Sequence, residues 1–193
     1  MRLPEIDRGD SLFNRLLIGF ISFVSRMRLP DAARVAFYHK AFFAPMGTWT
    51  HAAMRGPSAW SISERELMAA LVAKWNSCLF CLGAHGAVAA KGMERSLVDT
   101  VIADYRTAPI SEGLKATLQF LEIMTLRPAE LTAENARAVL DAGVSPEALQ
   151  DAAAVAATFN IITRYANALG FVLPTADEFD RAATMLLKRG YAS

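Results

Sequence analysis

The sequence ELMAALVAKWNSCLFCLGAH, residues 66–85, contains both cysteines of the chain, Cys78 and Cys81, in C-x-x-C spacing. His85 follows the second cysteine by four residues, and Glu66 precedes the first by twelve. Alanine and leucine, which favour helices, fill half of the other positions, and a polar pair interrupts the run just before the first cysteine. The pattern predicts two consecutive helices joined by a short turn, with the second helix beginning at the cysteines.

This spacing would place the chemically active side chains of the second helix on one face. Successive residues of a helix turn by about 100°, so Cys78, Cys81 and His85 fall close together. The helix N-terminus favours a thiolate. A thiolate attacks a peroxide to give sulfenic acid, and a second cysteine one turn away converts that product to a disulfide. His85 would relay the proton to the leaving oxygen, and Glu66 would orient or accept it.

The same residues allow other interpretations. Glu66 could be the capping-box partner of Ser63, at the start of a helix. The two cysteines, His85 and Glu66 could bind zinc, although structural zinc sites normally show a second paired motif. The cysteines could also be small buried hydrophobic residues, or a non-catalytic redox sensor or scaffold whose dithiol only switches assembly. The joint spacing favours redox catalysis over each of these alternatives.

Composition sets wider limits on the protein. The chain has 193 residues, of which 53% are hydrophobic, so one domain with a sizeable core is expected. The net charge of +1 argues against a nucleic-acid partner. The mean hydropathy of +0.24 is high for a soluble monomer and suggests buried subunit interfaces. No cofactor or resident metal is predicted.

Helix signals dominate the whole chain, and no alternating strand pattern is found, so we expect a single all-α domain with many helices. A first helix is expected from Asp10 or Ser11. The residues from Thr48 to Trp60 are rich in aromatic residues, glycine and proline and are expected to form a loop. The other expected helices cover residues 31–43, 63–75, 78–91, 96–103, 111–126, 132–142, 145–169 and 177–189.

The N-terminal part differs in character from the rest. Residues 16–24 form an apolar run between Arg15 and Arg26. This run is too short to span a bilayer, which takes roughly 20 residues. We expect a helix that packs on the body or on a neighbouring subunit, with peripheral membrane contact as the alternative. Residues 1–30 are therefore assigned to an N-terminal helical extension and residues 31–193 to the all-α domain.

No export signal is recognised, and the expected compartment is the cytoplasm. In that reducing environment, a C-x-x-C motif is more often catalytic or metal-binding than a permanent disulfide.

The spacing E-x11-C-x2-C-x3-H resembles the alkylhydroperoxidase D-like (AhpD-like) branch of the carboxymuconolactone decarboxylase family. Residues 159–170, FNIITRYANALG, resemble a later helix of the same family. The resemblance covers roughly residues 33–193 and is strongest over 66–86. It implies an all-α fold whose subunits assemble as trimers, hexamers or related rings. It also implies reduction of organic hydroperoxides by a disulfide cycle.

The resemblance implies a role for each residue of the motif. Cys81 would be the peroxidatic cysteine, and Cys78 the more exposed resolving cysteine that meets a dithiol or thioredoxin-like electron donor. His85 and Glu66 would form the proton relay. The best-known members have a further histidine directly before the second cysteine, where this chain has Phe80, so the relay is expected to be shorter. The presence of both cysteines argues against the decarboxylase branch.

Overall fold

The computed structural model describes residues 1–38 and 40–191, so residues 192–193 at the end of the predicted domain lie outside it. The described residues form only helices and connecting loops, which confirms the all-α prediction. The α-helices are α1 (Pro4–Arg8), α2 (Leu12–Ser25), α3 (Asp31–Arg34), α4 (Lys40–Arg55), α5 (Ile62–Trp75), α6 (Leu79–Ala89), α7 (Arg95–Asp104), α8 (Glu112–Leu126), α9 (Ala133–Asp141), α10 (Pro146–Leu169) and α11 (Ala176–Arg189). Two short 3₁₀ turns, Val35–Phe37 and Pro128–Glu130, complete the described elements.

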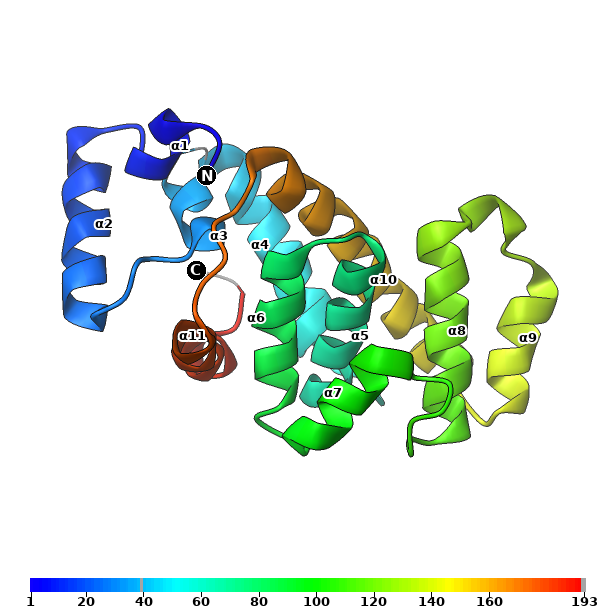
Figure 1. The fold of residues 1–193 in the computed structure, drawn as a ribbon. Helices are drawn as coiled ribbons and strands as arrows, with labels where there is room; N and C mark the ends of the chain where they lie inside the picture. The colour runs from blue at the N-terminus through cyan, green and yellow to red at the C-terminus, as the bar shows by residue number, and fades with distance from the viewer. Residues whose placement is uncertain (39, 192–193) are drawn as a thin grey trace.

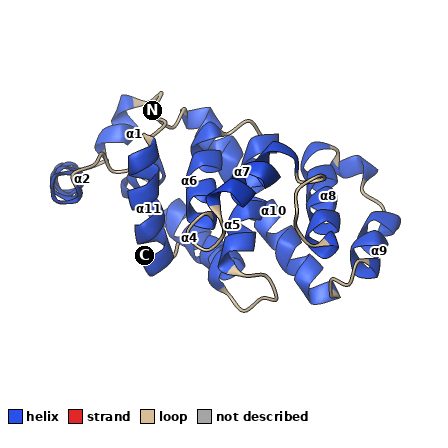
Figure 2. Ribbon diagram, turned by 60° about the horizontal axis from the view of Figure 1, so that its bottom comes forward, coloured by secondary structure: helices blue, strands red, loops and turns tan. Residues whose placement is uncertain are grey.

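Helix α5 forms the centre of the molecule. It packs against α6, α10, α8 and α4, and all its residues from 65 to 73 are buried. Apolar side chains cover this helix on every side, as expected for one enclosed by neighbours. Figure 1 shows α5 and α6 in the middle, with α2 at one end of the molecule and α8 and α9 at the other. Figure 2 shows the same order along the molecule from a second direction.

The start of α5 differs from the prediction in a way that matters for the site. Ser61, and not Ser63, caps the helix: its Oγ accepts a hydrogen bond from the Glu64 N–H at 3.2 Å. The Glu64 carboxylate in turn accepts one from the Ser61 N–H at 2.8 Å. The sequence contains two overlapping boxes of this type, and the helix uses the earlier one. The alternative in which Glu66 caps the helix with Ser63 is therefore excluded, and the Glu66 side chain lies in the interior.

The prediction of a loop from Thr48 to Trp60 is wrong for residues 48–55, which are helical, and correct for residues 56–60. Helix α4 begins at Lys40, continues to Arg55 and contains Pro45, a residue type that is disfavoured inside a helix. Proline removes a backbone hydrogen bond, but α4 buries Phe43, Thr50 and Met54, and it packs against α10 and α5. Tertiary burial thus outweighs the local breaking signal.

The N-terminal helix α2 does not pack its apolar face on the body. Of its residues only Ile18 is buried. Figures 1 and 2 show α2 at the edge of the molecule, away from the central helices. Among the described residues, no helix is both long and apolar enough to cross a membrane.

Candidate active site

A tight turn between α5 and α6 positions the first cysteine. The Cys78 N–H donates to the Ala73 carbonyl at 2.8 Å, which closes α5 in the manner of a Schellman motif. This motif needs a left-handed residue, and Ser77 fills that position with φ of 55°. From α10, Asn167 Nδ2 donates to the Asn76 carbonyl at 2.9 Å and fixes the turn. Cys78 is thereby held as the N-cap of α6.

The two thiols are reduced, close together and unequal. Hydrogen bonding from the Cys81 side chain, aided by the backbone N–H groups of Cys81 and Phe80, lowers the pKa of Cys78 to about 7 although burial opposes this. The same sulfur–sulfur hydrogen bond, together with burial and the neighbouring charge, raises the pKa of Cys81 well above its ordinary value. Cys78 is therefore the cysteine of the pair that ionises near neutral pH, as the N-terminus of a helix favours, while Cys81 keeps its proton.

Neither cysteine is at the surface, since Cys78 and Cys81 are 1% and 2% exposed. These exposed fractions do not distinguish the two cysteines, so the expectation that Cys78 is the more exposed stays a prediction. Both belong to a small apolar cluster that includes Phe80 and Ala166 and is covered in part by Phe171. Cys78 nevertheless lines an open pocket, described below, that Cys81 does not line.

Glu66 is the centre of a buried hydrogen-bond network behind the cysteines. Its side chain is fully buried and has three partners. His85 Nδ1 lies 2.6 Å from Oε2, while Arg55 Nη2 at 2.8 Å and the Tyr191 hydroxyl at 2.7 Å both donate to Oε1. Burial alone would raise the pKa of Glu66, but His85, Arg55 and Tyr191 together lower it. A carboxylate with three such donors stays ionised in the interior.

His85 connects this carboxylate to the helix that carries the cysteines. It is 6% exposed, and its ring packs edge-on against Phe159 with centroids 4.4 Å apart. Because the ionised Glu66 accepts the Nδ1 proton, Nε2 is the nitrogen that can accept another proton. His85 lies four residues after Cys81 within α6, which is one helical turn. The structure thus joins the predicted pair of His85 and Glu66 by a direct hydrogen bond.

Two residues of this network were not predicted from the sequence. Arg55 ends α4, in the segment expected to be a loop, and its guanidinium lies 4.9 Å from the centre of the Tyr191 ring. Tyr191 follows α11 and is brought in by Gly190, whose φ is 69°. A Cβ at Gly190 would also lie only 2.6 Å from the His51 ring, so glycine suits this position on both counts. Burial and the charge of Glu66 raise the pKa of Tyr191, which keeps its phenol neutral and donating.

A pocket of about 360 Å³ opens at Cys78. Its lining residues come from the N-terminus, the start of α6 and the end of α10: Arg2, Ser77, Cys78, Leu79, Phe80, Ala166, Asn167, Gly170, Phe171 and Leu173. The Phe80 ring packs on Phe171 with centroids 5.2 Å apart. Phe80 therefore supports the wall of this pocket.

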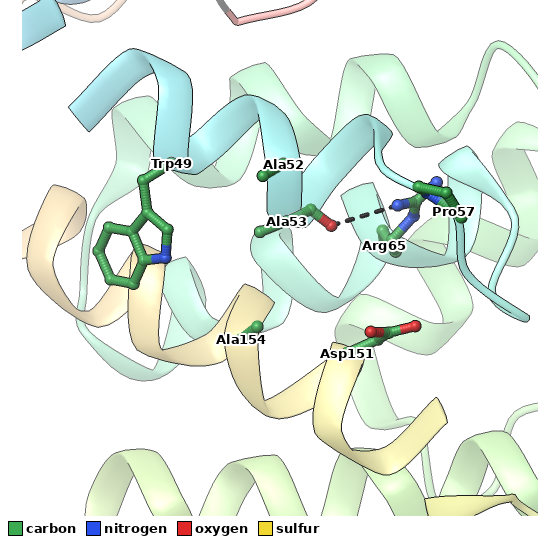
Figure 3. A pocket seen from close by; sticks show the side chains of 7 residues that line it. All are labelled: Trp49, Ala52, Ala53, Pro57, Arg65, Asp151 and Ala154. Atoms are coloured by element: carbon green, nitrogen blue, oxygen red, sulfur yellow. Dashed lines mark hydrogen bonds between the residues drawn. The ribbon is translucent and has the colours of Figure 1, made fainter. Parts of the chain in front are cut away.

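A second hollow, of about 180 Å³, lies between α4 and α10 and contains none of the predicted site residues (Figure 3). Arg65 lines it and donates from Nη1 to the carbonyls of Ala53 at 3.2 Å and Gly56 at 2.8 Å. These bonds tie the end of α4 to α5.

The arrangement gives the zinc alternative no support. Among residues 1–38 and 40–191, no group of three or more histidine, cysteine, aspartate and glutamate side chains is placed to hold a metal ion. The Glu66 oxygens are turned toward Arg55, Tyr191 and His85.

Comparison with family models and with curated proteins gives no match. Solved structures do share the fold. An uncharacterized peroxidase-related protein from Silicibacter sp. TM1040 aligns with a TM-score of 0.74 at 24% identity, over 87% of each chain. An alkylhydroperoxidase AhpD core, an uncharacterized peroxidase-related protein from Ralstonia eutropha JMP134, aligns with the same score and identity over 93% of this chain and 94% of that one. The chain thus has the fold of the AhpD core.

Proposed function

We propose that this protein is a thiol peroxidase that reduces organic hydroperoxides through a Cys78–Cys81 disulfide cycle. The observation that carries the proposal is the buried pair of Glu66 and His85, joined at 2.6 Å and one helical turn from a reduced dithiol. A carboxylate that orients an imidazole beside a thiol is the arrangement that thiol activation requires. The AhpD-core fold agrees with this chemistry.

In the proposed reaction, His85 Nε2 takes the proton of Cys81, and Glu66 stabilises the resulting imidazolium. The Cys81 sulfur attacks one peroxide oxygen, the O–O bond breaks, and the alkoxide leaves as an alcohol with the proton from His85. The Cys78 thiolate then attacks the sulfenic sulfur and the S–O bond breaks. The hydroxide that leaves takes up a proton from solvent, equal to the one that Cys78 lost on ionising, and becomes water. The peroxide gains two electrons, and the dithiol loses two as it becomes a disulfide.

The pocket at Cys78 supplies a route for the reductant. A dithiol or thioredoxin-like donor would attack the Cys78 sulfur, form a mixed disulfide, and release both protein thiols when its second sulfur closes its own disulfide. Leu79, Leu173 and Phe171 give the pocket apolar walls, and Cys78 lies in its lining. We place this cycle in the cytoplasm, where such donors are available, and in a homo-oligomer.

The first experiment treats the reduced protein with one equivalent of cumene hydroperoxide and follows free thiols and intact mass. We expect both thiols to disappear, the mass to fall by two hydrogens, and turnover to continue with dithiothreitol. Cys81→Ser should abolish turnover, and full activity in that variant would refute the proposal. Oxidation that changes the oligomeric state without turnover would support the redox-sensor alternative instead.

A second experiment decides which sulfur attacks. Cys78 has the lower pKa of the two thiols, whereas the family resemblance gives the attack to Cys81. With one equivalent of hydroperoxide and dimedone, Cys78→Ser should form a trapped sulfenic acid on Cys81, and Cys81→Ser should form little. The opposite result would exchange the two roles and leave the disulfide cycle intact.

A further inference from the structure

Helix α2 is amphipathic but is oriented with its apolar face outward. Six large apolar side chains of this helix are between 62% and 82% exposed. They are Leu12, Phe13, Leu16, Phe20, Phe23 and Val24, here called the α2 face. At 100° per residue they occupy one side of the helix.

Hydrogen bonds to its own chain fix this orientation. Asn14 Nδ2 donates to the Phe37 carbonyl at 2.9 Å, and Ser22 Oγ accepts from the Leu29 N–H at 3.3 Å. Ile18, on the same side, is buried. The polar side of α2 is thus satisfied by the chain, so turning the apolar face inward would break these bonds.

The α2 face is large enough to form a stable interface. Aromatic side chains bury about 150–250 Å² each, so the six exposed side chains offer on the order of 700 Å². A standard interface buries about 800 Å² on each partner. A patch of this size on a monomer would exceed what ordinary soluble proteins usually leave uncovered.

The charge of the helix indicates what covers this face. Arg15 is the only charged residue between Leu12 and Ser25. A helix that lies on a membrane typically carries many lysines and arginines on its polar side, whereas the side of α2 opposite its apolar face carries Asn14 and Ser22, which bond to the same chain, and the buried Ile18. An uncharged face can meet its own copy across a two-fold axis without repulsion.

We propose that the α2 face is a dimerisation surface, which packs against the α2 face of a second copy of this chain. Residues 12, 16, 20 and 23 follow the spacing of a helix–helix seam. No residue of the Glu66 network belongs to this surface, so the proposal stands or falls independently of the peroxidase activity.

Sedimentation velocity of the full chain tests the proposal. The wild type is expected to be a dimer or a multiple of one, and Phe20→Ser/Phe23→Ser should halve its mass. Leu126→Ser is the matched control, because Leu126 is 49% exposed on α8, at the other end of the molecule. A monomeric wild type at tens of micromolar, or an unchanged mass in the double variant, would refute the proposal.

Two further measurements protect this test from a folding defect. In a Cys78→Ser/Cys81→Ser chain, Leu16→Cys should form a disulfide between two copies on mild oxidation, and Leu126→Cys should not. Circular dichroism should show the double variant to be as helical as the wild type. Binding of a monomeric wild type to anionic phosphatidylglycerol vesicles, lost in the double variant, would assign the face to a membrane and overturn the dimer.

Discussion

The α5–α6 pair and helix α2 are opposite cases of burial in one molecule. Around α5 and α6 the chain buries an ionised carboxylate and provides it with three donors. At α2 the chain leaves six large apolar side chains uncovered while it satisfies the polar ones. The first region is complete within one chain. The second region exposes apolar surface to water, which is unfavourable, and a second surface that covered it would lower the free energy.

The difference in burial indicates that the two regions have different roles. A buried charge is maintained only where its position matters, because its desolvation must be offset by well-placed partners. An exposed apolar face is maintained where association matters. The comparison therefore makes substitutions in the two regions distinguishable: those around Glu66 should change stability and chemistry, and those on α2 should change assembly.

The largest expected effect is that of Glu66→Gln. It leaves Arg55 and His85 buried without their countercharge, and breaking such a pair costs about 3–5 kcal/mol. Urea unfolding measures the loss, and peroxidase turnover should fall in parallel. Glu112→Gln serves as the control, because its side chain is 80% exposed and should change stability by under about 0.5 kcal/mol. Equal effects for the two variants would show that the buried ion pairs of Glu66 contribute no more to stability than an exposed carboxylate does.

The pH dependence of this effect has a definite sign. The folded-state pKa of Glu66 is lowered, so its contribution to stability is present above the unfolded carboxyl pKa. That contribution is lost as pH falls through the folded-state pKa. The difference in unfolding free energy between wild type and Glu66→Gln should therefore be large at pH 7 and shrink in acid.

Tyr191→Phe is expected to have the next largest effect. It removes one donor from the ionised Glu66, and hydrogen bonds to charged groups contribute about 1.5–3 kcal/mol. With less support the pKa of Glu66 rises, so the pH profile of turnover should move toward higher pH. Tyr165→Phe is the comparison, since that ring packs on Phe43 outside the network. An unchanged profile in Tyr191→Phe would limit Tyr191 to a packing role.

A smaller effect is expected when pH changes the fraction of Cys78 that is present as thiolate. Cys78 has a pKa of about 7, so its thiolate fraction should fall about tenfold for each pH unit well below that value. Alkylation by iodoacetamide, read by mass at Cys78, measures the midpoint. Cys81→Ala removes the main hydrogen bond and should raise the midpoint. A wild-type midpoint at the ordinary thiol pKa of about 8.5 would contradict the hydrogen bond that Cys81 donates to the Cys78 sulfur.

The smallest predicted change is a gain in stability from Ser77→Gly. Ser77 holds a left-handed conformation, which suits glycine better by about 0.5–1 kcal/mol. Chemical denaturation of the reduced protein should show this gain, and Ser77→Ala should show none. A loss on Ser77→Gly would mean that the Ser77 side chain contributes more to the turn than its backbone strain costs.

The sequence predicted those parts of the molecule that depend on residues close to one another along the chain. Cys78, Cys81 and His85 lie on one helix, and Glu66 precedes them on the adjacent helix, so spacing alone could relate them. Most of the later helices were also predicted to within about two residues, because capping residues and prolines mark their ends.

The remaining features depend on contacts that no local pattern encodes. Tyr191 reaches Glu66 across 125 positions of sequence, and no spacing rule connects them. Helix α4 was missed because its burial outweighs Pro45, and the start of α5 was misplaced because two capping boxes overlap. For α2 the apolar face could be predicted, but the direction in which it points depends on Asn14 and Ser22 bonding to distant backbone.

The position of Tyr191 also has a thermodynamic consequence. Its hydroxyl contacts the same carboxylate that orients His85, so seating of residues 190–191 and proton binding at Glu66 are linked equilibria. Linkage of this kind is reciprocal. Protonation of Glu66 weakens the seating of residues 190–191, and unseating of these residues favours protonation of Glu66 by the same free energy. Amide hydrogen exchange at Tyr191, far along the chain from the cysteines, therefore serves as a remote reporter of charge in the active site.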